Sequence, residues 1–474
     1  MRKNEILTLT ITDITLQGAG IARHEGQVVF IPGTAVGDTV KAVIIKPKEN
    51  YAIGKLLQVL EPSPDRAEVD CPCFPACGGC DFRHLKYEAE LRLKEDNLRE
   101  TLRRIGGIEV PVRPIRPSAE ICRYRNKTFV PVGLDKDGKL IGGFYARGTH
   151  RIVPCASCLL EKPSTEHILR TVMDWAVDCG VSIYDEQSHT GLLRHIMVRY
   201  TQDETDVGIG LVINGNSIPR ADLLIRNIRA KFKNIRCFLL VHNTERTNVV
   251  NAGPVTILWG NPILTEKVCG LTFEVSPKVF MQINHAQMEV LYAVARGYAL
   301  AGGGAPTGHE RPVGAVLSDK PILLDLYCGA GTIGLTMADA CKEVIGVELV
   351  EPSVKDAIRN AKKNGIQNAR FLQLDASMAA AKLAREGVEP DIVIVDPPRK
   401  GCEESLLRII THSFRPARLV YISCDPATLA RDLRYIAANG YTVREVTPVD
   451  MFPRTGHVES CCLCVRDETA AESV

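Results

Sequence analysis

The sequence predicts an α/β protein: a doubly wound, Rossmann-like parallel sheet, preceded by an OB-like β-barrel and a mixed β domain. Its 474 residues are enough for about three domains. Residues 1–60 alternate apolar and polar positions in short runs, which is typical of a small barrel. After residue 277, apolar strands alternate with helix-like stretches, which is typical of a parallel sheet. We expect boundaries of 1–62, 67–276 and 277–467, followed by a disordered tail, 468–474.

The N-terminal half is assigned from its local patterns. The runs ILTLTIT, QVVFI, TVKAVII and KLLQVL, separated by glycine and proline, predict an antiparallel barrel over 1–62. A helix starting near Lys86, placed at about 86–121, is predicted to pack on the C-terminal domain, although its apolar spacing stops at Gly106–Gly107. Short β-like runs over 121–275, with a helix near 163–178, predict the mixed β domain.

Composition limits the classes of protein to consider. The N-terminus MRKNEILTLT lacks the apolar core of a signal peptide, and no stretch is long and apolar enough for a membrane helix, so we expect a cytoplasmic protein. In a reducing compartment, the 17 cysteines are buried thiols, metal ligands or a nucleophile. The formal charge of +2 gives no global reason to expect a nucleic-acid partner.

Polar residues follow successive strands of the predicted parallel sheet. The turn Cys328-Gly329-Ala330-Gly331-Thr332 follows strand 322–327, and Glu348 and Asp375 end the next two strands. This layout predicts a nucleoside-binding crevice, and Gly334 keeps a dinucleotide possible. Asp396, in DIVIVDPPRKG, is expected to face the substrate; a rigid structural turn is the alternative. The sequence 301–320 is rich in Gly and Pro and predicts a flexible insertion.

A candidate nucleophile follows strand RLVYIS. Cys424 precedes a helix whose dipole would favour the thiolate, although a strand-end cysteine can also be a small buried residue. Methylation at carbon 5 of a pyrimidine would use both a thiolate, which adds to carbon 6, and a base, which removes the hydrogen from carbon 5. Glu459 is our candidate base and His457 its competitor.

Five motifs together resemble the RNA uracil-C5 methyltransferases of the RumA/TrmA family: FMQINHAQ (280–287), LDLYCGAGTIGL (324–335), VDPPRKG (395–401), SCDPATLARDL (423–433) and GHVES (456–460). The resemblance implies that Cys424 is the nucleophile and Glu459 the proton acceptor. It also implies that S-adenosylmethionine contacts Gln282, Tyr327, Thr332, Glu348, Asp375 and Asp396. Asp425 departs from the asparagine that more often follows the nucleophile in this family.

A cluster of cysteines, Cys71, Cys73, Cys77 and Cys80, is joined by Cys155 and Cys158 about eighty residues later. Its density favours a metal site. Cys73, Cys77 and Cys80 have the spacing of radical S-adenosylmethionine enzymes. Cys71, Cys77 and Cys80 with a distant fourth thiolate would instead form a closed cluster with no open iron. A four-cysteine zinc site also fits the spacing. The segment CPCFPACGGCDFRHL resembles the [4Fe–4S] segment of the ribosomal RNA branch of the family. That resemblance implies that Cys71, Cys77, Cys80 and Cys158 are the ligands.

RNA is the expected partner. Residues 99–151 carry 12 Lys and Arg against 5 Asp and Glu, a local charge of +7, and CRYRNKTF mixes cations with aromatic residues. GAGIARHEGQVVFIPGTAVGD resembles a TRAM domain, an RNA-binding module. We therefore expect a monomeric methyltransferase acting on 23S ribosomal RNA. The alternatives are a transfer RNA enzyme, a radical enzyme and a non-catalytic RNA-binding iron–sulfur protein.

Overall fold

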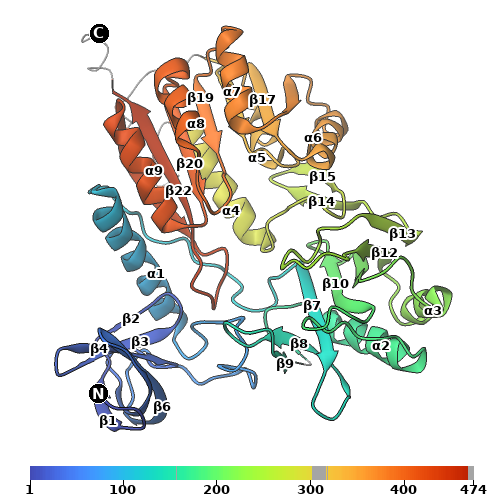
Figure 1. Ribbon diagram of the computed structural model, residues 1–474. Coiled ribbons are helices and arrows are strands. Elements are labelled where there is room, and N and C mark those ends of the chain that lie inside the picture. The colour runs from blue at the N-terminus through green and yellow to red at the C-terminus, as the bar shows by residue number, and fades with distance from the viewer. Residues whose placement is uncertain (156, 302–316, 318, 468–474) are drawn as a thin grey trace.

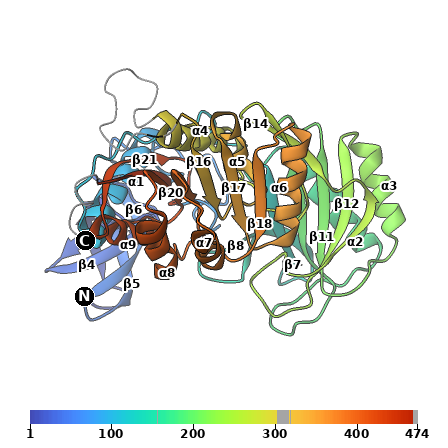
Figure 2. The ribbon, with the colours of Figure 1, turned by 90° about the horizontal axis from the view of Figure 1, so that it is seen from above.

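The computed structural model describes residues 1–155, 157–301, 317 and 319–467. Three large β-sheets follow one another along the chain (Figure 1). The N-terminal barrel lies at the lower left of this view, the central sheet at the right and the C-terminal sheet at the top. Figure 2 looks down on the C-terminal sheet, with the N-terminal barrel to its left and the central sheet to its right. The expected tail and most of the expected insertion lie outside the described residues.

The C-terminal sheet has seven strands in the order β18-β17-β16-β19-β20-β22-β21. The neighbouring pairs from β18 to β20 are parallel, whereas β22 runs antiparallel to both β20 and β21. This arrangement confirms the predicted doubly wound sheet. The strands are β16 (Ile322–Leu326), β17 (Glu343–Glu348), β18 (Ala369–Gln373), β19 (Ile392–Val395), β20 (Arg418–Ser423), β21 (Tyr441–Val449) and β22 (Glu459–Arg466).

Both faces of this sheet are buried under helices. Side chains alternate between the faces, so that Ile392 and Ile394 pack in one hydrophobic cluster and Val393 and Val395 in the other. This burial on two sides explains why its strands are continuous apolar runs. The helices are α4 (His285–Arg296), α5 (Thr332–Leu335), α6 (Glu351–Lys363), α7 (Ala376–Arg385), α8 (Glu404–Arg408) and α9 (Pro426–Ala438).

Two segments from outside residues 277–467 pack on the C-terminal sheet. Helix α1 (Tyr87–Thr101) continues as a π-helical turn, Leu102–Gly106, and its Leu98 and Leu102 join the cluster that includes α9. The hairpin β14 (Leu264–Val268) and β15 (Leu271–Val275) joins the cluster on the other face. The packing core of this domain therefore begins before the expected boundary at residue 277.

The helix placed at about 86–121 is shorter than expected. It ends at Gly107, whose φ of 63° lies in the left-handed region that glycine adopts easily. The chain beyond it contains three prolines between Val110 and Pro117 and pairs with β21 through the bridges Val112–Val446 and Arg116–Val449. Proline cannot continue a helix, so only the part up to Gly106 is helical.

The N-terminal region forms a six-stranded sheet in the order β1-β5-β6-β4-β3-β2. Its small apolar cluster includes Val29, Ile31 and Val40. The pair β4–β6 is parallel, which differs from the expected antiparallel pairing, because alternation of residues does not report strand direction. The strands are β1 (Ile6–Thr10), β2 (Asp13–Ile14), β3 (Ala19–His24), β4 (Gln27–Pro32), β5 (Thr39–Pro47) and β6 (Tyr51–Glu61).

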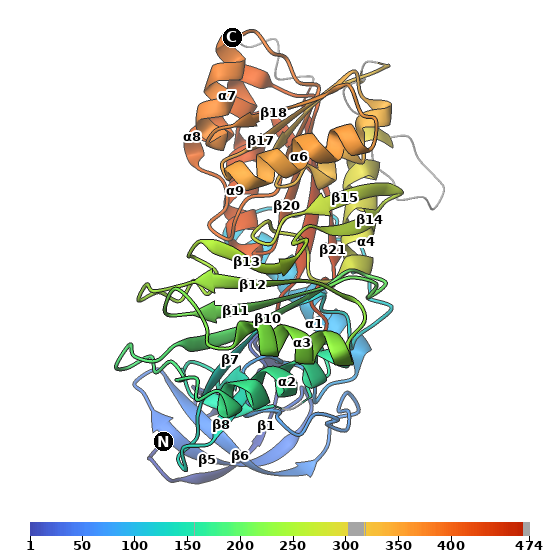
Figure 3. The ribbon, with the colours of Figure 1, turned by 90° about the vertical axis from the view of Figure 1, so that its right-hand side faces the viewer.

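The central sheet has seven strands in the order β13-β12-β11-β10-β7-β8-β9, of which β11 and β12 are parallel neighbours. Helices α2 (Ser164–Asp178) and α3 (Ala221–Lys231) pack together along this sheet (Figure 3). This confirms the mixed β domain. The strands are β7 (Lys127–Leu134), β8 (Leu140–Tyr145), β9 (Ile152–Pro154), β10 (Leu193–Tyr200), β11 (Val207–Ile213), β12 (Ile235–His242) and β13 (Val255–Gly260).

No helix in the described part of the chain is both long enough and apolar enough to cross a membrane.

Candidate active site

The candidate catalytic residues meet at one edge of the C-terminal sheet. Parallel strands place their carboxyl ends at the same edge, so Tyr327, Asp396 and Cys424, which follow β16, β19 and β20, lie there together with Glu348 at the end of β17. Glu459 begins the antiparallel strand β22 at this edge. Because Ser423 pairs with Ser460, Cys424 and Glu459 occupy the next opposed positions across the β20–β22 ladder.

Burial and neighbouring carboxylates set the charge of this site. Burial, followed by the charge of Glu459, raises the pKa of Cys424 to about 11. Burial, followed by the charge of Asp396, raises the pKa of Glu459 to about 8. Burial also raises the pKa of Asp396 to about 7. The resting site therefore favours the neutral thiol and a protonated Glu459 at neutral pH.

The expected stabilisation of the Cys424 thiolate by helix α9 is not what the structure shows. Asp425 caps this helix, and its Oδ1 accepts hydrogen bonds from the backbone N–H groups of Ala427 at 3.0 Å and Thr428 at 2.9 Å. The capping carboxylate thus takes up donors that would otherwise favour a thiolate. Burial and the charges of Glu459 and Asp396 raise the pKa of the Cys424 thiol, and the charge of Arg399 lowers it.

Arg399 is a site residue that the sequence reasoning missed. Its positive charge lowers the pKa of both Cys424 and Glu459 against the larger effect of burial. The residue lies in the motif VDPPRKG, three positions after Asp396. The motif was therefore the available signal, but nothing in its spacing showed that the cation would face the nucleophile.

His457 differs from Glu459 in exposure, although Arg399 acts on both: burial and then the Arg399 charge lower the pKa of His457. Its side chain is exposed, and its ring packs edge-on against Phe452 with the ring centroids 6.0 Å apart. Glu459 is 3% exposed and interacts electrostatically with Cys424. A base that acts on a substrate held by Cys424 must lie beside it, so the geometry favours Glu459.

The glycine turn after β16 is held by Glu348. One carboxylate oxygen accepts a hydrogen bond from the Gly329 N–H at 3.1 Å, and the other accepts one from the Val350 N–H at 2.8 Å. Each oxygen keeps a further acceptor site, as ribose hydroxyl recognition needs. Gly331 has a φ of 78°, and a Cβ there would lie 3.3 Å from that of Ala357, so the turn requires glycine.

A buried carboxylate beneath this turn, that of Asp325, was also missed. Asp325 lies within β16, and its Oδ2 accepts a hydrogen bond from the Gly334 N–H at 2.9 Å. Burial raises its pKa to about 7. This contact fixes the start of α5 and gives Gly334 a structural role. A polar residue inside an apolar strand was the available signal.

The remaining predicted cofactor residues have clear local partners. Thr332 shares a hydrogen bond with the Tyr292 hydroxyl at 2.8 Å. Gln282 is 5% exposed, and its backbone oxygen accepts a hydrogen bond from Asn126 at 3.0 Å. Asp375 caps α7 through Ser377 N–H at 2.9 Å. For Asp375, the geometry therefore supplies a capping role that the sequence reasoning did not consider.

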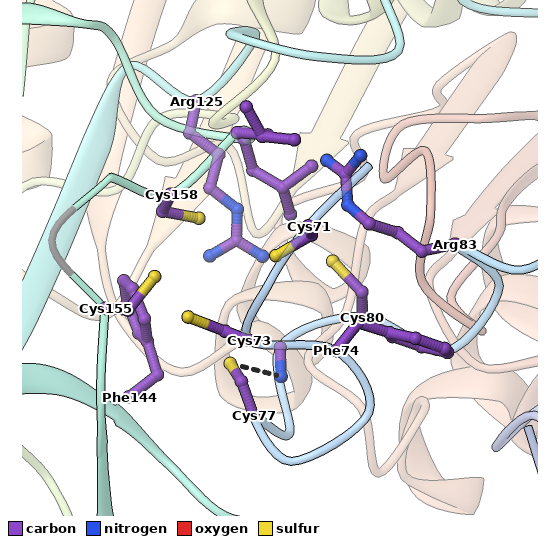
Figure 4. Close-up of a pocket in the computed structure, with 13 residues that line it drawn as sticks. Cys71, Cys73, Phe74, Cys77, Cys80, Arg83, Arg125, Phe144, Cys155 and Cys158 are labelled. Carbon is purple, nitrogen blue, oxygen red and sulfur yellow. Dashed lines mark hydrogen bonds between the residues drawn. The ribbon is translucent and has the colours of Figure 1, made fainter. Parts of the chain in front are cut away.

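Six cysteines line one cavity between the segment 71–80 and the loop that follows β9 (Figure 4). Burial raises the pKa of Cys80 to about 11 and that of Cys158 to about 12. Arg83 and Arg125 line the same cavity, and the buried Nε atom of each has no hydrogen-bond partner. Arg83 is ion-paired with Asp70 through Nη1, but the free Nε–H groups of both arginines beside the thiols are suited to an anionic group. The cysteines are Cys71, Cys73, Cys77, Cys80, Cys155 and Cys158.

These thiols are not arranged around a single point. Among the described residues, no three His, Cys, Asp or Glu side chains form a group that could hold one metal ion. A four-cysteine zinc site needs its thiolates around one ion. An iron–sulfur cluster instead takes one thiolate on each of four irons.

The strand order and the residues at its edge define a Rossmann-like methyltransferase fold. The structure superposes on that of the Pyrococcus abyssi tRNA (uracil-54, C5)-methyltransferase in complex with S-adenosyl-L-homocysteine, with a TM-score of 0.74, 23% identity and coverage of 97% of this chain and 99% of that chain. The family model tRNA (uracil-5-)-methyltransferase matches residues 313–467, and the TRAM domain model matches residues 2–57.

Relatives extend this similarity over the whole chain. A protein of Halalkalibacterium halodurans named an uncharacterized RNA methyltransferase is 39% identical over 461 residues, which is 97% of each chain. A protein of Clostridium tetani with the same description is 36% identical over 98% of this chain and 97% of its own. The chain belongs to the RNA uracil-C5 methyltransferase family.

Proposed function

We propose that this enzyme transfers a methyl group from S-adenosylmethionine to carbon 5 of a uridine in 23S ribosomal RNA, through a covalent adduct with Cys424. The observation that carries the proposal is the pairing of a partly buried thiol and a buried carboxylate across β20 and β22, beside Asp396. A nucleophile and a base at adjacent positions are what methylation of this unreactive ring carbon needs.

Each residue has a defined task in this reaction. The Cys424 thiolate adds to carbon 6 of the uracil, which makes carbon 5 nucleophilic enough to take up the methyl group. Glu459, as the carboxylate, then accepts the hydrogen of carbon 5, and the thiolate leaves carbon 6. Arg399 supports the anionic forms of both residues. The pKa of about 8 suits Glu459 to proton transfer near neutral pH.

S-adenosylmethionine supplies the methyl group, and the edge of the sheet fits it. Glu348 keeps free acceptor sites on oxygens that the glycine turn orients, as binding of ribose hydroxyls requires. Tyr327, with Gln282 and Asp396, would complete the contacts, and Thr332 and Asp375 would line the site. The carboxyl groups of Glu348 and Asp396, both half-buried, would lie on the side of a cationic sulfonium.

The thiol cavity fits a [4Fe–4S] cluster held by Cys71, Cys77, Cys80 and Cys158. The six-thiol lining and the two unpartnered guanidinium nitrogens support this proposal. Cys73 and Cys155 would then be spare, and they already interact with each other. A radical mechanism through Cys73 is less well supported, because a thiol nucleophile and a base lie together in the C-terminal sheet.

Ribosomal RNA is our first candidate substrate because the cysteine segment resembles the ribosomal branch of the family. Transfer RNA is the second candidate, since the Pyrococcus abyssi protein, which aligns with 97% of this chain, is named for a transfer RNA substrate. The TRAM domain and the +7 segment at 99–151 are suited to either RNA. We propose that the enzyme acts in the cytoplasm as a monomer.

Mapping 5-methyluridine in cells that lack the protein tests this proposal. We expect a 23S ribosomal RNA position to lose its methyl group, and wild-type protein but not Cys424→Ala to restore it. Loss of the mark from transfer RNA alone would identify the second candidate as correct. No change in either RNA would contradict the proposed function.

A further inference from the structure

Asp81, the residue after Cys80, contacts the segment that leads to Glu459, the candidate base. The Oδ2 atom of Asp81 accepts a hydrogen bond from the Gly456 N–H at 2.8 Å. The backbone N–H of Asp81 donates to the Arg454 carbonyl at 2.8 Å. Gly456 lies only three residues before Glu459. The cysteine segment is therefore bonded, by side chain and backbone, to the chain that positions the base.

The same contact includes the N-terminal barrel. A Cβ atom at Gly456 would lie 1.8 Å from the Leu16 carbonyl oxygen, and one at Gly18 would lie 2.3 Å from the Asp81 carbonyl oxygen. Both glycines are thus required for close backbone approach. Barrel, cysteine segment and catalytic domain meet at this junction, which confines Gly456 between Leu16 and Asp81.

The central domain reaches this junction through the other side of Asp81. Arg147 forms an ion pair with the Oδ1 atom of Asp81, while Oδ2 bonds Gly456. Within the cysteine segment, the Gly78 N–H donates to the Tyr145 carbonyl at 3.0 Å. One carboxylate therefore links the loop after β8 to the segment before Glu459, using a different oxygen for each.

The start of the base-bearing segment is held separately. Lys94 is fully buried in α1 and donates to Glu90 and Asp450 at 2.7 Å each, and to the Phe452 carbonyl at 3.3 Å. Residues 450–458 between β21 and β22 have no helix or strand. Their position must therefore come from such contacts. In the last part of this segment, Thr455 Oγ1 accepts a hydrogen bond from the His457 N–H at 3.3 Å, and Asp81 supplies the side-chain contact from outside the segment, at Gly456.

We propose that Asp81 is a positioning residue, whose carboxylate fixes Gly456 and so places Glu459 for removal of the carbon 5 hydrogen. The inference rests on the proposed function, because Glu459 must be the base. The inference also links the thiol cavity to catalysis. Because Asp81 directly follows the cysteine segment 71–80, the position of that segment affects where Glu459 lies during removal of the carbon 5 hydrogen. Misplacement of a reacting group by about 1 Å can lower a rate about 100-fold.

The test compares Asp81→Ala with a matched control, Asp65→Ala. Asp65 precedes the cysteine segment and forms an exposed ion pair with Arg92 of α1. The assay measures methyl transfer from radiolabelled S-adenosylmethionine to total RNA from cells lacking the enzyme. It also measures protein–RNA adduct that survives denaturing electrophoresis and carries the label. This adduct accumulates when methyl transfer proceeds but removal of the carbon 5 hydrogen is slow.

We expect Asp81→Ala to lower kcat at least about tenfold, to leave KM for S-adenosylmethionine within about twofold, and to accumulate labelled adduct. Asp65→Ala is expected to match the wild type in all three. Asp81→Asn should be intermediate, because an amide has one acceptor oxygen for two donors. Thermal unfolding and iron content are measured for each variant. If Asp81→Ala does not fold, Asp81→Asn decides through the same adduct measurement.

Two outcomes separate this inference from the proposed function. If Asp81→Ala, or Asp81→Asn in its place, releases methylated RNA as fast as Asp65→Ala and shows no excess adduct, the positioning role is wrong while the function stands. If the wild type itself methylates no RNA, the proposed function fails. A slow Asp81→Ala without adduct would also overturn the inference, because it would place the defect before methyl transfer.

Discussion

The protein contains two desolvated thiol environments, and their neighbours make them different. Cys424 is a single thiol between the carboxyl groups of Glu459 and Asp396, with Arg399 as the nearby cation. The cavity near the barrel holds six thiols with Arg83 and Arg125. Burial raises thiol pKa values in both places. A base beside one thiol is suited to transient ionisation, whereas several thiols beside buried cations are suited to a permanently bound anionic cluster.

Of the variants that distinguish the two thiol environments, Cys424→Ala is expected to lower the rate of methyl transfer most. Without a nucleophile, carbon 5 of the uracil does not react, so methyl transfer should fall by at least about 1,000-fold. Radiolabel transfer from S-adenosylmethionine to RNA measures it, and the iron content should remain that of the wild type. Full activity in this variant would contradict the assignment.

Glu459→Gln should come next in size. Glutamine keeps the shape of the side chain but cannot accept the proton, and loss of a general base lowers turnover by about 100-fold to 10,000-fold. Labelled adduct should accumulate, as for Asp81→Ala but more strongly. His457→Gln serves as the control and should retain most of the activity; the reverse result would make His457 the base.

The pH dependence of wild-type turnover tests the raised pKa of Glu459. The active form is the carboxylate, and a pKa of about 8 means that its fraction rises about tenfold between pH 7 and pH 9. Turnover should therefore increase with pH through about 8, measured under saturating RNA and S-adenosylmethionine. A flat profile from pH 6 to 9 would show that proton removal by Glu459 does not limit the reaction.

The smallest effect on activity is expected in the other thiol environment. Cys158→Ser should lose bound iron and lower turnover several-fold, because the cysteine segment is held less firmly beside Gly456. Cys73→Ser should keep both iron and activity. Iron analysis and visible absorption of anaerobically purified protein measure the difference. Loss of activity in Cys73→Ser alone would instead favour the radical register.

Local pattern predicted most of the C-terminal domain, because its strands are buried on both faces and end in polar residues. The same pattern placed Cys424, Glu459 and Asp396 at strand ends, where parallel topology brings them together. Cys461 and Cys462, at successive positions of β22, lie in the hydrophobic clusters on opposite faces of the sheet. Elements that are set by apolar strand patterns and by glycine turns could therefore be predicted from the sequence alone.

Features that depend on distant contacts could not be read in this way. The bridges between the chain after helix α1 and β21 join residues more than 330 positions apart. The raised pKa of Cys424 results from burial and from carboxylates on two other strands. Asp81 lies in the segment CPCFPACGGCDFRHL, but nothing in that segment indicates its hydrogen bond to Gly456. Long-range packing decided each of these.

The covalent adduct is the most direct test of the central claim. RNA in which uridine is replaced by 5-fluorouridine lacks a hydrogen that Glu459 can remove, so the adduct should persist after methyl transfer. We predict that mass spectrometry of the digested wild-type complex finds the modified nucleotide on the peptide containing Cys424, and that Cys424→Ala forms no adduct. An adduct at another residue, or methylated 5-fluorouridine released without any adduct, would contradict the account.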